Sequence, residues 1–137
     1  MSKKLSYKNA LKRATEIMRD KQLVTRLIHD TKDTFQSKAK TSEKIQAVKF
    51  QLFTFIRLVR AYIKGYYREV SVKNMLYTVG VLIYFVTPTD IVPDFLPVGG
   101  FVDDAALIIW LYKQLGDEVK QFLEWESKHK QITSINE

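Results

Sequence analysis

Four carboxylates stand in an otherwise apolar stretch of this chain, which reads YFVTPTDIVPDFLPVGGFVDD from residue 84 to residue 104. A carboxylate in apolar surroundings is costly unless it is paired with a cation, bound to a metal or protonated. The prolines and the Gly-Gly pair of this stretch predict tight turns, which we expect to bring the carboxylates together. The candidate cluster consists of Asp90, Asp94, Asp103 and Asp104.

Helix capping explains part of this cluster without any chemistry. The run TPTD has the form of a helix start, with Thr87 as N-cap and Asp90 bonding back to it. Asp103 and Asp104 fall in the first turn of the last predicted helix, where the positive end of the helix dipole favours a carboxylate. Capping does not explain why four carboxylates should converge.

Repulsion between converging carboxylates demands a cation or raised pKa values. We expect lysine or arginine side chains of the same chain to hold the cluster, with no metal and no cofactor. The candidate partners are Arg57, Arg60, Lys64, Arg68 and Lys73. The alternative is Mg²⁺ or Ca²⁺ bound by Asp90, Asp94, Asp103 and Asp104, since both ions prefer oxygen ligands.

With Mg²⁺ bound, the cluster would serve an enzyme that acts on a phosphorylated substrate. The sequence contains no glycine-rich phosphate loop, no nucleophile elbow and no His/Glu metalloprotease motif. It also lacks cysteine, which excludes thiolate metal sites and cysteine nucleophiles. We therefore predict no catalytic residue and a non-enzymatic protein.

The charge is distributed unevenly along the chain. Residues 1–70 carry 17 basic and 6 acidic side chains, a net charge of +11, whereas residues 71–137 carry 5 basic and 9 acidic side chains, a net charge of −4. Such asymmetry favours contact of the basic half with phosphates or acidic lipids, or internal pairing with the acidic half.

A helix predicted over residues 43–70 concentrates this positive charge. Its apolar residues form a packing seam at three- and four-residue steps. Off the seam lies a basic face that also receives Phe50 and Phe53, and no acidic residue falls between Lys44 and Arg68. This mixture of cations and aromatics suits an anionic membrane surface or a nucleic-acid backbone. The seam consists of Ile45, Val48, Leu52, Phe55, Val59, Tyr62 and Tyr66, and the basic face of Arg57, Arg60, Lys64 and Arg68.

A second predicted helix, over residues 72–86, is almost wholly apolar. The uncharged span over residues 74–89 is 16 residues long, short of the roughly 20 needed to cross a bilayer. We favour a helix buried at the centre of a bundle over a hairpin that dips into a membrane with residues 91–112. We expect the core to contain Ile83, Val86, Ile108 and Ile109.

Helical periodicity runs through the whole chain, so we predict an all-α, compact helical bundle of four to five helices with a Pro/Gly/Asp-rich connection before the last helix. A basic N-terminal helical segment (1–40) has a break near residues 20–22 and ends in the linker KAKTSE, with Thr41 or Ser42 capping the next helix. The bundle proper (41–137) ends in a helix over residues 101–128 with a bend at Gly116. The sequence shows no secretory signal, so we expect a cytoplasmic protein.

The run from residue 88 to residue 108 resembles the signature of the bacterial YkvA-like family, a domain of unknown function (DUF1232). The family pattern is Pro-x-Asp-x-x-Pro-Asp-x-x-Pro-x-x-Gly-x-x-Asp-Asp. The resemblance implies a small helical domain over about residues 70–111, associated with membranes through its hydrophobic helices and without an established activity. The matching residues are Pro88, Asp90, Pro93, Asp94, Pro97, Gly100, Asp103 and Asp104.

Together these features predict a non-enzymatic protein that associates peripherally with a membrane. We expect the basic aromatic helix face to contact an anionic membrane surface or a membrane-bound protein. Nucleic-acid binding through the basic N-terminal half is the alternative, although the sequence contains no recognised nucleic-acid-binding motif.

Overall fold

The computed structural model describes residues 12–87 and 104–129. Within these residues all regular structure is helical, which confirms the predicted all-α class. Residues 12–18 are helical, and six further helices follow. They are α2 (Lys21–Ala39), α3 (Glu43–Ala47), α4 (Lys49–Ile63), α5 (Val72–Val86), α6 (Asp104–Leu115) and α7 (Asp117–Lys128).

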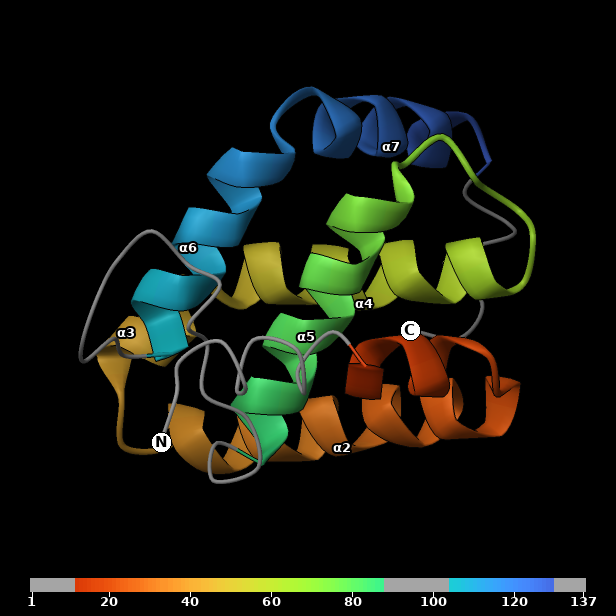
Figure 1. Cartoon of the computed structure of the whole chain (residues 1–137). Coiled ribbons are helices and arrows are strands. Elements are labelled where there is room, and N and C mark those ends of the chain that lie inside the picture. Colours follow the sequence, from red (N-terminus) through yellow and green to blue (C-terminus); the bar gives the residue numbers. More distant parts are fainter. Residues whose placement is uncertain (1–11, 88–103, 130–137) are drawn as a thin grey trace, which may run out of the picture.

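The apolar helix α5 lies at the centre of the molecule. It runs across one side of the neighbouring helices α2 and α4 (Figure 1) and packs against both of them and against α6. Side chains are buried on most sides of α5, among them Met75, Val79, Leu82 and Phe85, so the predicted central position is confirmed. Among the described residues, no helix combines the length and the apolar character that crossing a membrane requires.

The N-terminal half has the predicted break near residues 20–22 and the predicted cap at Ser42. The Asp20 carboxylate accepts hydrogen bonds from the backbone N–H groups of Gln22 (2.9 Å) and Leu23 (3.4 Å), which starts α2 at the predicted break. Ser42 Oγ accepts from the N–H of Ile45 (3.2 Å) and caps α3. Because α2 packs against α4 and α5, it shares their core, and the division of the chain at residue 40 stays a prediction.

The single helix predicted over residues 43–70 is wrong. Val48 has non-helical backbone angles (φ −105°, ψ 16°) and separates α3 from α4. The helix then ends at Ile63, because Gly65 adopts a φ of 80°, which favours glycine and turns the chain away. The predicted seam is buried from Ile45 to Val59. Tyr66 lies beyond the helix and is exposed.

The last predicted helix is divided at Gly116, where we expected only a bend. Gly116 has a φ of 44°, and α7 starts directly after it in a new direction across the end of the bundle (Figure 1). This break brings the acidic helix α7 beside the C-terminal half of α4, as the Arg57–Glu126 contact below shows. The two breaks, at Val48 and Gly116, raise the number of helices above the four to five expected.

The predicted core is partly correct. Ile83 and Ile108 are buried, and Val86 is partly buried against the core. Ile109 is not a core residue: it is 36% exposed. The reason is rotational, since neighbouring helical residues point about 100° apart and α6 packs inwards through Ile108 and Leu111.

Candidate functional site

Asp104 is the one residue of the aspartate motif that lies in the described part of the chain, and it begins α6. The prediction that four aspartates converge stays a prediction. The motif residues outside the described part are Pro88, Asp90, Pro93, Asp94, Pro97, Gly100 and Asp103.

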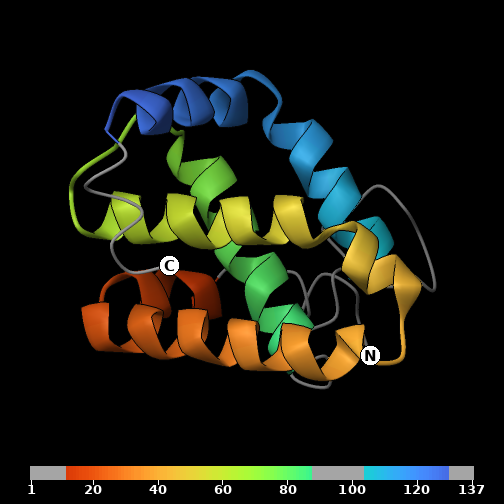
Figure 2. The same cartoon turned by 180° about the vertical axis from the view of Figure 1, so that it is seen from behind.

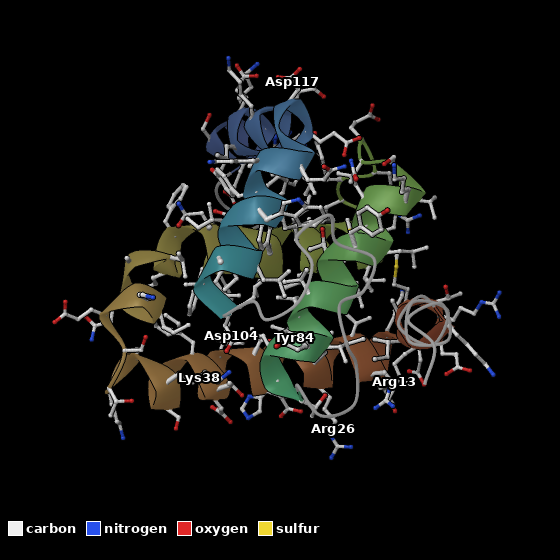
Figure 3. All side chains as sticks on the ribbon, turned by 60° about the vertical axis from the view of Figure 1, so that its left-hand side comes forward. Arg13, Arg26, Lys38, Tyr84, Asp104 and Asp117 are labelled. Atoms are coloured by element: carbon white, nitrogen blue, oxygen red, sulfur yellow. The ribbon has the colours of Figure 1, made fainter. Side chains whose placement is uncertain are left out.

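Asp104 forms an ion pair with Lys38 from the last turn of α2. Figure 3 shows the two side chains directed towards each other from their separate helices. The Lys38 ammonium also donates a hydrogen bond to the Phe85 carbonyl (3.2 Å) and lies 4.6 Å from the centre of the Phe85 ring. Both charged side chains are partly buried, with exposed fractions of 32% and 18%. One lysine thus ties α2 to the end of α5 and to the start of α6.

Lys38 was not among the predicted partners of the aspartates, which were sought on residues 57–73. We placed Lys38 in a linker, whereas α2 continues to Ala39. The signal that could have identified it is the buried stripe of α2, which runs through Leu27, Thr31 and Phe35. Lys38 follows Phe35 by three residues and therefore continues this stripe towards the core.

An open pocket of about 240 Å³ lies beside the ion pair, and its lining includes Lys38, Asp104, Thr41, Ser42 and Ile45. Several of these polar groups already have structural partners: Ser42 caps α3, and the two charges pair with each other. The described residues contain no group of three His, Cys, Asp or Glu side chains placed to hold a metal ion. The described polar contacts around this pocket therefore connect or cap helices.

The four residues of the predicted basic face do not form one exposed surface. Arg57 forms a bidentate pair with Glu126 of α7, with Nε–Oε2 and Nη2–Oε1 distances of 2.6 and 3.2 Å. The two side chains are only 17% and 14% exposed. Arg57 therefore belongs to the interior contact between α4 and α7 and not to an exposed face. For this residue the alternative of pairing with the acidic half of the chain is correct.

Arg68 also leaves the predicted face. It follows the end of α4, and its Nε donates to the Tyr62 carbonyl (2.6 Å) while the guanidinium lies 4.8 Å from the centre of the Tyr62 ring. This contact satisfies a carbonyl at the C-terminus of α4, where a cation is favoured by the helix dipole. Of the other two predicted cations, Arg60 is partly buried on α4, and Lys64, the C-cap residue of α4, is exposed.

The exposed side of α4 continues onto α2. The two helices lie side by side (Figure 2) and meet at an edge-to-face contact between Phe35 and Phe53 with centroids 5.4 Å apart. Lys38 projects about 60° to one side of Phe35, towards α5, and Lys32 projects about 60° to the other side, towards α4. Lys21 lies on the same side as Lys32.

We call this surface the α2–α4 cationic face. Its α4 part contains no acidic residue. Asp33 of α2 points about 100° away from Lys32 and pairs with His29 (3.3 Å). The exposed aromatic side chain of Phe50 follows Lys49 at its edge. The face consists of Lys21, Lys32, Lys49, Arg60 and Lys64.

Comparison with known proteins gives a family but no role. The profile of the family described as "Protein of unknown function (DUF1232)" matches residues 75–110. The "Uncharacterized membrane protein YkvA" of Bacillus subtilis (strain 168) is 33% identical over 72 residues, which are 53% of this chain and 68% of that protein. The chain belongs to the DUF1232 family. No solved structure matches it.

The DUF1232 match confirms the resemblance seen in the proline and aspartate motif. It extends from Met75 in α5 to Trp110 in α6. Lys38 lies outside this range, yet it contacts two residues inside it: Phe85, which precedes the motif, and Asp104, the last residue of the motif. In this DUF1232 protein, α2 therefore packs against the family-matched region although α2 itself lies outside the match.

Proposed function

We propose that this DUF1232 protein is a non-enzymatic helical module that associates peripherally with anionic membrane surfaces through the α2–α4 cationic face. The observation that carries the proposal is the composition and exposure of α4. This helix has no acidic residue. Lys49 and Phe50 are exposed at its start, and Lys64 is exposed directly after its end. Cations beside an exposed aromatic ring suit the interface of an anionic bilayer.

The energetics support a reversible attachment. Each lysine or arginine near an anionic leaflet contributes about 1 kcal/mol, and the attraction falls off within a Debye length of about 8 Å at physiological ionic strength. Several lysines on one face therefore give binding that salt weakens. The uneven charge of the chain, +11 over residues 1–70, points the same way.

The family relative supports the same class of function. The Bacillus subtilis protein is named a membrane protein. The described part of the present chain contains no helix able to span a bilayer, so the proposal takes attachment to the surface as the mode of association.

The test compares two triple variants in a vesicle co-sedimentation assay. Lys21→Gln, Lys49→Gln and Lys64→Gln together remove three exposed charges of the cationic face. Lys73→Gln, Lys120→Gln and Lys128→Gln remove three exposed charges from α5 and α7 and serve as the matched control. We expect the first variant to lose at least tenfold in binding to phosphatidylglycerol-containing vesicles and the control to lose much less.

Three outcomes would overturn the proposal. Equal losses in the two variants would show that only the net charge matters. Binding to native membranes but not to protein-free vesicles would assign recognition to a membrane-bound protein. Salt-sensitive binding to DNA or RNA without binding to lipid would favour the nucleic-acid alternative.

A further inference from the structure

Two large apolar side chains are exposed on the contacting helices α4 and α6. Phe50 of α4 is 56% exposed and Ile109 of α6 is 36% exposed. Tyr112 connects them: its ring lies 6.4 Å from that of Phe50, and it neighbours Ile109 at a three-residue step on α6. Single exposed apolar residues are ordinary, whereas neighbouring ones mark an interaction surface.

The surface around Ile109 is an open groove of about 550 Å³. Its walls are largely apolar and include Ala47, Val48, Ala106 and Trp110. This groove lies on the α6 side of the molecule that Figure 3 turns forward. Val48, which lines the groove, directly precedes Lys49 of the cationic face.

The charges at the groove indicate what covers it. Its described lining residues include two exposed lysines, Lys44 and Lys113, and no acidic side chain. An apolar centre with lysines beside it is complementary to an anionic bilayer, whose acyl chains accept the apolar groups while its headgroups attract the lysines. A half-buried tryptophan, here Trp110, is also typical of the membrane interface.

We propose that Phe50 and Ile109 form an apolar anchor that enters the acyl-chain boundary of an anionic bilayer, with Lys44, Lys49 and Lys113 at the headgroups. The anchor rests on the proposed function, since the cationic face brings the protein to the membrane. It adds that the protein inserts side chains instead of remaining in the aqueous layer above the headgroups. The corner formed by α3, α4 and α6 then faces the lipid.

A site-specific fluorophore tests this insertion directly. The sequence contains no cysteine, so Ala106→Cys provides one attachment point for an environment-sensitive NBD label inside the groove. Val72→Cys is the matched control: Val72 is 61% exposed at the start of α5, the helix that lies on the other side of α4 from the viewer in Figure 2.

On phosphatidylglycerol-containing vesicles, we expect the label at residue 106 to shift its emission to the blue and to be quenched by lipids brominated on their acyl chains. The label at residue 72 keeps its aqueous emission. If both labelled proteins co-sediment with the vesicles while both labels remain in water, the anchor is contradicted and the electrostatic attachment stands. If neither protein co-sediments, the proposed function itself fails.

A pair of double variants gives a second, independent measurement. Phe50→Ser with Ile109→Ser should lower vesicle binding about tenfold, because two apolar side chains no longer leave water, while the sensitivity to salt remains. The control, Leu23→Ser with Val72→Ser, changes two other exposed apolar residues and should bind as the wild type does. Unchanged binding by the first variant, or a dimer in the wild type that this variant abolishes, would overturn the anchor.

Discussion

Lys38 and Asp104 form an ion pair although 66 residues separate them in the sequence. The same ammonium donates to the Phe85 carbonyl, so α2 holds the end of α5 and the start of α6 together. Phe85 precedes the Pro/Gly/Asp-rich motif of the DUF1232 family, and Asp104 is the last residue of that motif. A residue outside the family-matched region thus contacts both the helix that precedes the motif and the last residue of the motif.

This pair should contribute measurably to stability. Lys38→Met and Asp104→Asn each remove a charge-assisted hydrogen bond from partly buried surroundings, which we expect to cost about 1–2 kcal/mol. Urea unfolding of the single and double variants gives the coupling between the two residues. Strictly additive effects would show that the ion pair contributes nothing.

Arg57 and Lys64 should separate stability from membrane binding. Arg57→Gln breaks the nearly buried bidentate pair with Glu126, which we expect to lower the free energy of unfolding by about 3 kcal/mol while vesicle binding of the folded protein changes little. Lys64→Gln alters an exposed residue, so it should weaken vesicle binding and leave the free energy of unfolding nearly unchanged. The claim fails if Arg57→Gln weakens vesicle binding as much as Lys64→Gln does.

Gly116 should be intolerant of any side chain. Its φ of 44° and ψ of −107° lie in a region that L residues rarely adopt, and an added Cβ would approach the Lys113 carbonyl to 3.4 Å. Gly116→Ala should therefore lower the free energy of unfolding by about 1–3 kcal/mol. Gln114→Ala, at an exposed position of α6, is the control and should have little effect. Equal stability of the two variants would contradict the assigned strain.

Tyr67 should make the protein less stable at alkaline pH. Burial raises the pKa of its hydroxyl, and the carboxylates of Glu69, Glu118 and Glu124 raise it further. As the pH rises through about 10, the unfolded chain loses this proton first, so the free energy of unfolding falls. Tyr67→Phe should weaken that alkaline decline. Urea unfolding of both proteins from about pH 8 to pH 11 checks this prediction. If the free energy of unfolding falls equally with pH in the two proteins, the prediction is contradicted.

The local features of the fold could be predicted because each depends on a few adjacent residues. Asp20 and Ser42 are caps by residue type, and the burial of α5 follows from its composition. The predicted bend at Gly116 is a full break, because whether a glycine bends or ends a helix depends on what the following segment packs against. Gly65 ends α4 through its positive φ, and this helix end was not predicted.

The tertiary partners could not be predicted from the sequence. Which cation of α4 meets a carboxylate depends on how α7 folds back, and only then does Arg57 rather than Lys64 face Glu126. The exposed position of Ile109 depends on a rotation of α6 by a single residue relative to the core. Asp104 was predicted to meet a cation on residues 57–73, whereas its partner comes from α2.

The most direct test of this account measures the co-sedimentation of the wild-type protein with vesicles as salt is raised. We predict strong binding to phosphatidylglycerol-containing vesicles at low salt, weaker binding at physiological salt, and little binding to purely zwitterionic phosphatidylcholine vesicles at either. Equal binding to both kinds of vesicle, or no binding to either at low salt, would contradict the proposal that this helical protein attaches to anionic membranes through its cationic face.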